Sequence, residues 1–542
     1  MTNKPFAITL DPASSRSNHT GGWRTERPVY LDRQPPCEAA CPAGEHPQDW
    51  LYQAEDGGYQ AAWQRIVAIN PLPAVMGRIC YHPCETACNR GQLDTAVGIN
   101  SVERFLGDEA LREDWSLPPA GADTGRRVLV VGAGPAGLSA AYQLRRLGHR
   151  VQLRDRAAEP GGMLRYGIPR FRLPAEVMQA EIDRVLALGI ELRLRAEVTD
   201  LAALLDRGEF DAAFVGVGAQ LSHRTYLPAV GSARVLDALH LLADVDGGAR
   251  PELGRRVAIY GGGNTAMDAA RTARRLGAAE AVVIYRRNMA HMPADPIEVT
   301  QAVDEGVRMR WLSTIADVDP AGITVERMRL DADGAPVGTG ELETMPADAV
   351  ILAIGEDVDH RLLDGLPDVA FADGRVQVSA DQATGRRGIW AGGDVTGRGG
   401  SVTAAIGHGR RAARAIDAWL AQRRDQAEPE RPPAAFDRLN TWYFSDAPRT
   451  VQPVLDAARR TSGFEEVVAG LTADNALFEA RRCLSCGNCF GCDNCYGVCP
   501  DNAVLKVSEG HGYAIDLDYC KGCGLCVSEC PAGAITMVPE QT

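Results

Sequence analysis

Apolar runs alternate with helical patterns through the middle of the chain. Residues 126–155 begin with the apolar run RVLVV, turn at glycines, continue in a helical pattern and end in a second apolar run. Residues 255–287 repeat this order, and shorter apolar runs occur at Phe214–Ala219 and Val350–Gly355. Alternating strands and helices predict βαβ units, which form parallel sheets covered by helices on both faces.

Composition narrows the classes of protein that fit. The chain has 542 residues and a net charge of −14, which argues against a nucleic-acid partner. It has no apolar run of the ~18 residues that a membrane span needs and no apolar leader, so we expect no membrane partner and a cytoplasmic location. Its 15 cysteines lie in two groups, five within residues 37–88 and ten within residues 483–530. This distribution favours metal ligation over disulfide bonds.

The first βαβ unit carries a dinucleotide-binding motif. Gly132, Gly134 and Gly137 form G-x-G-x-x-G between a strand and a helix, where they allow a tight turn, the approach of a pyrophosphate and close helix packing. The helix N-terminus offers free N–H groups to the phosphates. Asp155 ends the next strand, where an acid binds ribose hydroxyls. An ordinary glycine-rich turn is the alternative, and the strand, helix and acid together argue against it.

Two further segments indicate that FAD occupies this first site. GGMLRYGIP, which includes Gly162 and Met163, follows the acidic strand, and AGGDV, which includes Gly393 and Asp394, precedes a long helix. In folds like those of the flavoprotein disulfide reductases, a Gly-Asp pair near this position holds the ribityl chain. This resemblance implies the same role for Asp394, and capping of the following helix is the alternative.

The second βαβ unit ends without an acid. Residues 261–266 form a G-x-G-x-x-A motif, in which Gly261, Gly263 and Ala266 are the fixed positions and Asn264 and Thr265 lie between the last two. The next strand leads into Arg286 and Arg287. An acid there would repel a 2′-phosphate, whereas guanidinium groups bind it. We therefore predict an NADP(H) site, with a solvated arginine face as the alternative.

Two such sites on one chain predict hydride transfer between NADP(H) and FAD. Disulfide reductases of this fold also use a redox cysteine pair, but no cysteine lies between Asn89 and Arg482. The chain therefore cannot follow a disulfide-reductase mechanism, and its electrons must leave by another route.

The C-terminal cysteines have the spacing of a bacterial two-cluster ferredoxin. The pattern C-x2-C-x2-C-x3-C-P occurs twice, and the fourth cysteine of each run ligates the other cluster. One predicted ligand set is Cys489, Cys492, Cys495 and Cys530; the other is Cys520, Cys523, Cys526 and Cys499. Zinc is the alternative metal, but it does not call for the doubled C-P runs.

Several segments together resemble one family, the NADPH-dependent flavoprotein subunit of bacterial glutamate synthase and its relatives, which include the N-terminal half of dihydropyrimidine dehydrogenase. The similar segments are GRICYHPCETAC, INSVERF, GAGPAGLSAA, GGMLRYGIP, GGGNTAMDAA, VIYRR and GGDV. The resemblance covers about residues 30–425, and the ferredoxin tail is an addition found in some members.

The resemblance implies two further [4Fe–4S] clusters in the N-terminal region. Its cysteines are Cys37, Cys41, Cys80, Cys84 and Cys88. One family cluster uses three cysteines and a Glu or Gln, and Glu103 falls at that place; a helix-surface acid is the alternative. The spacing from Cys80 to Cys84 is shorter than in some members, so spacing alone does not divide the five thiols.

The other family cluster takes two ligands from an R-C-L-x-C segment that is missing from the N-terminal region here. The segment EARRCLSC, with Cys483 and Cys486, has the same pattern at the other end of the chain. We therefore predict that Cys37 and Cys88 share a cluster with Cys483 and Cys486. Free thiols on a helix are the alternative. Fifteen cysteines with Glu103 then supply four clusters.

These inferences predict an electron-transfer oxidoreductase that links NADP(H), FAD and four [4Fe–4S] clusters to a catalytic redox subunit or a ferredoxin, in either direction, within a hetero-oligomer. A docking adapter with little turnover is the alternative function. The expected fold is α/β, with a helical iron–sulfur domain, two Rossmann-like domains and a bacterial-ferredoxin-like α+β domain. The expected boundaries are an irregular arm at 1–30, the helical domain at 31–125, the FAD domain at 126–250 and 360–425, the NADP domain at 251–359, a linker with helices at 426–482 and the ferredoxin domain at 483–542.

Overall fold

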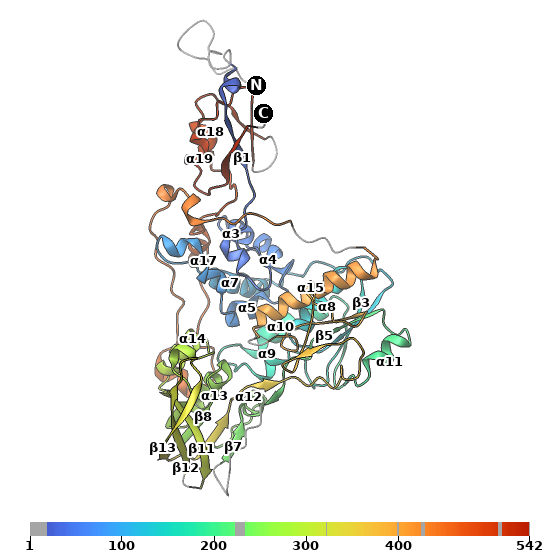
Figure 1. The fold of residues 1–542 in the computed structure, drawn as a ribbon, viewed down its shortest axis with the longest axis vertical. Coiled ribbons are helices and arrows are strands. Elements are labelled where there is room, and N and C mark those ends of the chain that lie inside the picture. Colours follow the sequence, from blue (N-terminus) through green and yellow to red (C-terminus); the bar gives the residue numbers. More distant parts are fainter. Residues whose placement is uncertain are drawn as a thin grey trace.

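The computed structural model describes residues 19–222, 234–320, 322–397, 400–423, 429–507 and 512–540. The cysteine-rich C-terminal unit stands at one end of an elongated molecule and the second dinucleotide-binding unit at the other (Figure 1). The helical unit and the first parallel sheet lie between them. Residues 1–18 of the predicted arm lie outside the described residues. None of the described helices is long and apolar enough to cross a membrane.

Short helices form the N-terminal unit. Several begin with proline, whose fixed φ suits a first helical turn and whose missing N–H is not needed there. Trp50 and Trp63 are buried in its core, together with Ala476 and Ala480 of a helix close to the C-terminus. The elements are α2 Pro36–Ala39, α3 Pro47–Ala54, α4 Tyr59–Val67, α5 Pro73–Ile79, α6 Pro83–Thr86, η2 Asn89–Gln92, α7 Ile99–Arg112 and the late helix α17 Ala473–Arg481.

The first βαβ unit lies in a parallel sheet with the strand order β18-β5-β2-β3-β4. Its strands are β2 Arg127–Val131, β3 Arg150–Arg154, β4 Glu191–Arg193, β5 Ala212–Val215 and β18 Ile389–Ala391. Its helices are α8 Pro135–Arg146, α9 Met163–Tyr166, α10 Ala175–Leu186, α11 Leu201–Asp206 and α15 Val402–Leu420. Because β18 pairs with β5, this unit is built from two separate stretches of the chain.

The second βαβ unit lies in another parallel sheet, with the order β10-β9-β8-β14-β7. Its strands are β7 Arg234–Asp237, β8 Arg256–Tyr260, β9 Glu280–Ile284, β10 Arg308–Arg310 and β14 Ala349–Leu352. Its helices are α12 Ala238–Asp246, α13 Asn264–Arg275, η3 Met289–His291 and α14 Pro296–Asp304. The sequence places residues 234–246 with the first unit, but β7 pairs with β14 here. The two sheets confirm the predicted α/β class.

An antiparallel meander covers one face of the second sheet. Ile315, Val318 and Val325 pack against Val282 and Ile284 of that sheet. The meander strands are β11 Ser313–Asp319, β12 Gly322–Leu330 and β13 Pro336–Met345. Short antiparallel pairs form between β6 Leu221–Ser222 and β15 Glu356–Asp357, and between β16 Phe371–Ala372 and β17 Arg375–Val376.

The C-terminal unit is completed by residues from the start of the chain. Its own elements are β19 Val504–Lys506, β20 Tyr513–Ile515, β21 Ile535–Pro539, α18 Asn494–Val498 and α19 Leu525–Ser528. The arm predicted to be irregular contains η1 Thr20–Trp23 and β1 Glu26–Tyr30, and β1 pairs antiparallel with β21. The sequence pattern missed β1 because its partner lies at the opposite end of the chain.

The predicted linker region is mostly extended, with fewer helices than its pattern suggests. It contains η4 Phe436–Arg438, η5 Thr441–Tyr443 and α16 Ala457–Ser462 before α17. The helix α16 contacts α13 of the second dinucleotide-binding unit, whereas α17 contacts α3 and α7 of the helical unit. The region therefore connects units that the sequence order keeps apart.

Candidate functional site

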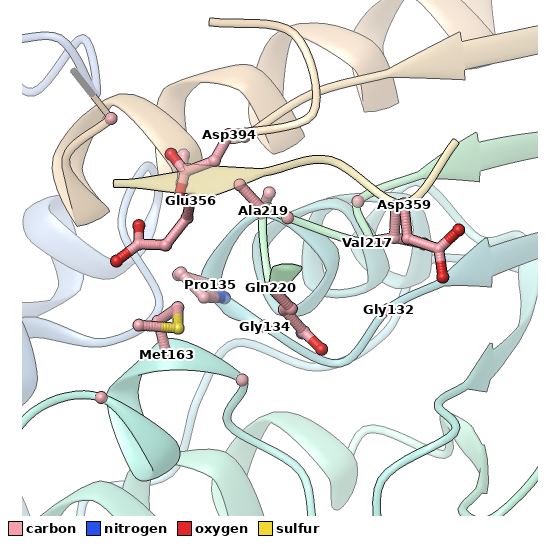
Figure 2. A pocket seen from close by; sticks show the side chains of 18 of the residues that line it. Gly132, Gly134, Pro135, Met163, Val217, Ala219, Gln220, Glu356, Asp359 and Asp394 are labelled. Carbon is pink, nitrogen blue, oxygen red and sulfur yellow. The ribbon is translucent and has the colours of Figure 1, made fainter. Parts of the chain in front are cut away.

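One cavity of about 980 Å³ brings the two dinucleotide motifs together. Figure 2 shows the part of its wall around Gly132, Gly134 and Met163. Residues that follow β2, β5, β14 and β18 line it, which places it at the carboxyl ends of parallel strands, where such folds bind ligands. The predicted cofactor-binding residues on its wall are Gly132, Gly134, Asp155, Gly162, Met163, Gly263, Asn264, Thr265, Gly393 and Asp394. The predicted residues that do not line it are Gly137, Gly261, Arg286 and Arg287.

The glycines of both motifs leave backbone open to this cavity. Gly132 has a φ of +102°, which favours glycine, and a Cβ at Gly137 would overlap the carbonyl oxygen of Gly132. A Cβ at Gly263 would meet no atom within 4 Å, because its backbone faces open space just before α13 begins. A pyrophosphate can therefore approach the N-termini of both α8 and α13. The shape fits two dinucleotides.

Asp155 lies directly beneath the first glycine turn. Its two carboxylate oxygens accept hydrogen bonds from the backbone N–H groups of Ala133 and Ala157, each at 2.7 Å. A carboxylate has further lone pairs, so Asp155 is fixed in place and can still accept a hydroxyl donor from the cavity.

Two acids lie close together on another part of the wall, and Figure 2 shows both. Burial raises the pKa of Asp394, against the opposing charge of Arg375. Burial also raises the pKa of Glu356, which accepts a hydrogen bond from Thr265 Oγ1 at 3.3 Å. The sequence prediction included Asp394 but missed Glu356. Glu356 directly follows the apolar run Val350–Gly355, and this position at the end of a predicted strand could have identified it as a site residue.

A buried set of charged residues crosses from the first unit to the second. Arg172 forms ion pairs with Asp268 at 2.7 Å and with Glu298 at 2.5 Å, and it donates to Tyr81 Oη at 3.3 Å. Further pairs join Arg271 to Glu298 and Glu305 at 3.0 Å, and Arg275 to Glu305 at 2.5 Å. We call this set the interdomain ion network: Tyr81, Arg172, Asp268, Arg271, Arg275, Glu298 and Glu305.

This network also reaches the cavity, because Tyr81, Arg172 and Asp268 line it. Asp268 is buried, and its Oδ1 atom has no hydrogen-bond partner among the described residues. Sequence reasoning missed these residues, because they come from three separate segments and only folding brings them together.

The arginine pair lies at the end of β9, beside the second motif. Arg286 is exposed and Arg287 is half-buried, and neither forms an ion pair with a described residue. The buried Arg287 Nε atom has no partner in the described part of the chain. Both guanidinium groups thus keep donors for an anion.

Four thiols from the two ends of the chain meet beside α17. Burial raises the pKa of Cys37, and the charges of Cys483, Cys88 and Cys486 raise it further. Burial raises the pKa of Cys486 to about 11, while a hydrogen bond with Asn89 opposes this shift. Such mutual effects require the four sulfur atoms to be neighbours. The structure therefore brings together the four residues that we predicted to share one cluster.

A second group contains the other N-terminal thiols. Burial raises the pKa of Cys84, with Glu85, Cys80, Cys41 and Glu103 as further causes in that order. Thr403 Oγ1 and the backbone N–H of His82 donate to Cys80 Sγ at 3.1 and 3.2 Å.

Glu103 is almost fully buried in this second group. Burial raises its pKa well above the usual range, and the charge of Glu45 adds to the shift. The amide of Asn70 donates to both carboxylates at 2.9 Å. The structure therefore contradicts the alternative of a helix-surface acid.

The ferredoxin-type cysteines also fall into two groups. After burial, the charges that raise the pKa of Cys495 are those of Cys489, Cys492 and Cys530. For Cys526, whose pKa is raised to about 12, they begin with Cys520, Cys499 and Cys523. The fourth cysteine of each run thus lies with the other run, which is the arrangement that the spacing predicts.

Iron–sulfur clusters fit these four groups. Burial and mutual repulsion disfavour the charged thiolate form of grouped cysteines when no metal is bound. Bound iron would stabilise that thiolate form.

The fold and the cavity define a two-dinucleotide oxidoreductase, and family comparisons identify its kind. Residues 126–409 match the model described as pyridine nucleotide-disulphide oxidoreductase. Residues 26–115 match dihydropyrimidine dehydrogenase domain II with a 4Fe-4S cluster, and residues 488–534 match a 4Fe-4S dicluster domain. The chain belongs to the pyridine nucleotide-disulphide oxidoreductase family and joins an FAD- and NADP-binding fold to 4Fe-4S domains, which confirms the predicted resemblance.

Relatives extend this similarity over most of the chain. The chain is 32% identical over 515 residues to NADP(+)-dependent formate dehydrogenase subunit beta of Moorella thermoacetica, covering 83% of this chain and 70% of that protein. It is 35% identical over 423 residues to the glutamate synthase [NADPH] small chain of Escherichia coli K12, covering 71% and 89%. It is 34% identical over 391 residues to the putative oxidoreductase YgfK of Escherichia coli O157:H7, covering 70% of this chain and 38% of YgfK.

Proposed function

We propose that the chain is an electron-transfer subunit that links NADP(H) through FAD to four [4Fe–4S] clusters. The shared cavity carries this proposal, because both glycine motifs open onto it and Tyr81, next to Cys80, forms part of its wall. When bound, FAD exchanges electron pairs with a nicotinamide and single electrons with iron–sulfur clusters. The residues of this chain form the two dinucleotide sites and the four thiol groups, and the fold sets the positions of these sites relative to one another.

Each part of the cavity has a role in this proposal. The turn at Gly132, Gly134 and Gly137 receives the FAD pyrophosphate, Asp155 binds its ribose, and Asp394 holds its ribityl chain. The other predicted FAD contacts are Gly162, Met163 and Gly393. The NADP pyrophosphate lies at the start of α13, against Gly261, Gly263, Asn264 and Thr265, and Arg286 and Arg287 bind the 2′-phosphate.

The four thiol groups hold one cluster each in this proposal. The first set is Cys37, Cys88, Cys483 and Cys486. The second is Cys41, Cys80, Cys84 and Glu103. The others are Cys489, Cys492, Cys495 and Cys530, and Cys520, Cys523, Cys526 and Cys499. The second set lies next to the cavity, because Tyr81 adjoins Cys80, and the first set joins the helical unit to the C-terminal unit.

We propose that this subunit works with a catalytic redox subunit or a ferredoxin in a cytoplasmic hetero-oligomer. The names of the formate dehydrogenase subunit beta and the glutamate synthase small chain support this, because both describe one part of a larger enzyme. A docking adapter would not need a cavity lined by two dinucleotide motifs.

Anaerobic mixing with NADPH tests this function. We expect the flavin absorbance to bleach first and the iron–sulfur absorbance to bleach after it, within one turnover. NADH at the same concentration is the control. A flavin that is reduced while all the clusters stay oxidised would contradict the proposal and favour the adapter.

Replacing Arg286 and Arg287 together by alanine is expected to weaken NADPH binding selectively. Each charge-assisted hydrogen bond to the 2′-phosphate contributes about 1.5–3 kcal/mol, or roughly a ten- to 150-fold change in affinity. The measurement is NADPH and NADH affinity in the double variant. Arg308→Ala is the control, because this exposed arginine of the same unit pairs with Glu280 and with no other acid among the described residues. Equal use of NADH and NADPH by the unaltered chain would contradict the assignment.

A chain of residues 31–488 is expected to keep flavin reduction by NADPH and to lose reduction of an added ferredoxin. The deletion removes β1 together with the C-terminal unit, because β1 would otherwise remain as an unpaired edge strand. A full-length Cys520→Ser, Cys523→Ser variant removes one C-terminal ligand set without the deletion. Unchanged ferredoxin reduction in both proteins would mean that electrons leave from the N-terminal clusters.

A further inference from the structure

The start of the chain is bound into the C-terminal unit over its whole described length. Residues Glu26–Tyr30 pair in register with Pro539–Ile535. Arg24 donates to the carbonyl oxygens of Leu517 and Cys520 at 2.5 and 3.0 Å, and it forms an ion pair with Glu540 at 2.7 Å. Because Cys520 is a predicted ligand, this segment contacts the ligand loops themselves.

The strand β1 also contributes to the small core around the ligands. Tyr30 packs with Cys495, Val504, Cys526 and Ile535. Its ring stacks on that of Tyr513, with centroids 6.1 Å apart and planes 20° from parallel. Without β1, the strand β21 would present an unpaired edge. The N-terminal segment is therefore a structural part of the C-terminal unit.

The Tyr30 hydroxyl donates a hydrogen bond to Cys495 Sγ at 3.2 Å. The stacked Tyr513 differs in this respect, because its hydroxyl donates to Asp493 Oδ1 at 2.6 Å. Two parallel tyrosines in one core thus have different partners. Tyr30 donates to a ligand sulfur, whereas the Tyr513 hydroxyl bonds to the carboxylate and the backbone N–H of Asp493.

We propose that Tyr30, brought in by the N-terminal strand, raises the reduction potential of the cluster held by Cys489, Cys492, Cys495 and Cys530. A donor to a ligand sulfur stabilises the added negative charge of the reduced cluster, and such hydrogen bonds are among the determinants of cluster potential. Tyr30 acts through Cys495 and is a positioning residue. This inference rests on the proposed function, which assigns the four cysteines to one cluster.

Redox titration of the full-length protein, followed by EPR, tests the proposal with Tyr30→Phe. This substitution keeps the ring and its stacking and removes only the donor. We expect the midpoint potential of one ferredoxin-type cluster to become more negative, with the other midpoints and the iron content unchanged. Tyr513→Phe is the matched control, because it removes the neighbouring hydroxyl from Asp493, and its midpoints should equal those of the unaltered chain.

Three results would overturn the proposal. One is a full iron content with unchanged midpoints in Tyr30→Phe. Another is an equal shift in Tyr513→Phe, which would trace the effect to packing in the tyrosine pair. The third is loss of iron from Tyr30→Phe, which would give the hydroxyl a role in cluster assembly. None of these is the failure of the proposed function itself, in which the unaltered chain would hold no ferredoxin-type clusters.

Discussion

Replacing Cys483 and Cys486 together by serine is expected to remove about four irons per molecule while the ferredoxin-type EPR signals remain. Cys37, Cys88 and Cys483 pack against the same buried cluster, and after burial the charges of Cys483, Cys88 and Cys486 act to raise the pKa of Cys37. A [4Fe–4S] cluster that loses two of four ligands is not retained. The measurement is iron content together with EPR of the reduced protein.

The same variant should also interrupt the path between the two ends of the protein. NADPH should still bleach the flavin, but the C-terminal clusters should stay oxidised over the time of one turnover. The Cys520→Ser, Cys523→Ser variant is the matched control, because it removes the same number of thiols and should leave the signal of the shared cluster in place. Retention of the full iron content in the Cys483, Cys486 variant would contradict the shared cluster.

Replacing Glu305 by glutamine is expected to lower the free energy of unfolding by about 3–5 kcal/mol, because it leaves the buried Arg275 without a carboxylate partner and leaves Arg271 with Glu298 alone. The side chains of Glu305, Arg271 and Arg275 are fully buried. Urea denaturation followed by circular dichroism measures the change. Glu280→Gln is the control. Its partner Arg308 is 72% exposed, so its loss should cost less than about 1 kcal/mol. Equal effects of both variants would contradict the role of the network.

The contribution of Glu305 also predicts a pH dependence. Burial acts to raise the pKa of Glu305, but hydrogen bonds from Arg275 and Arg271 outweigh it and hold the pKa below its ordinary value. The stabilisation is therefore present above the ordinary carboxyl pKa of about 4.3 and is lost as the pH falls through the lower folded-state pKa. The difference between the unaltered chain and Glu305→Gln should shrink over that range.

Local patterns predicted the parts of the site that short segments build. The glycine motifs fix strand, turn and helix within about a dozen residues, and the cavity does open at Gly132 and Gly263. The cysteine spacing likewise predicted which ferredoxin-type thiols lie together. Glu103 needed the family resemblance, because a single acid on a helix carries no spacing signal of its own.

Local sequence patterns could not predict contacts between segments that are far apart in the chain. The strand β1 depends on β21 for its hydrogen bonds, so its own five residues carry little evidence of a strand. Residues 234–246 follow the first unit in sequence but belong to the second sheet, because β14 provides their pairing partner. Arg172 and Asp268 gave no signal either, because a buried ion pair is visible only once both elements are placed.

The participation of both ends of the chain in shared units has a consequence for synthesis on the ribosome. The core of the helical unit includes Leu471, Ala476 and Ala480, and β1 can pair only after β21 has been synthesised. The helical unit and the C-terminal unit can therefore be completed only when translation is nearly finished. The two parallel sheets, which lie between these units in the sequence, have all their strands by residue 391. A prematurely terminated product would contain folded dinucleotide-binding sheets and an open helical unit, with cysteines exposed to oxidation.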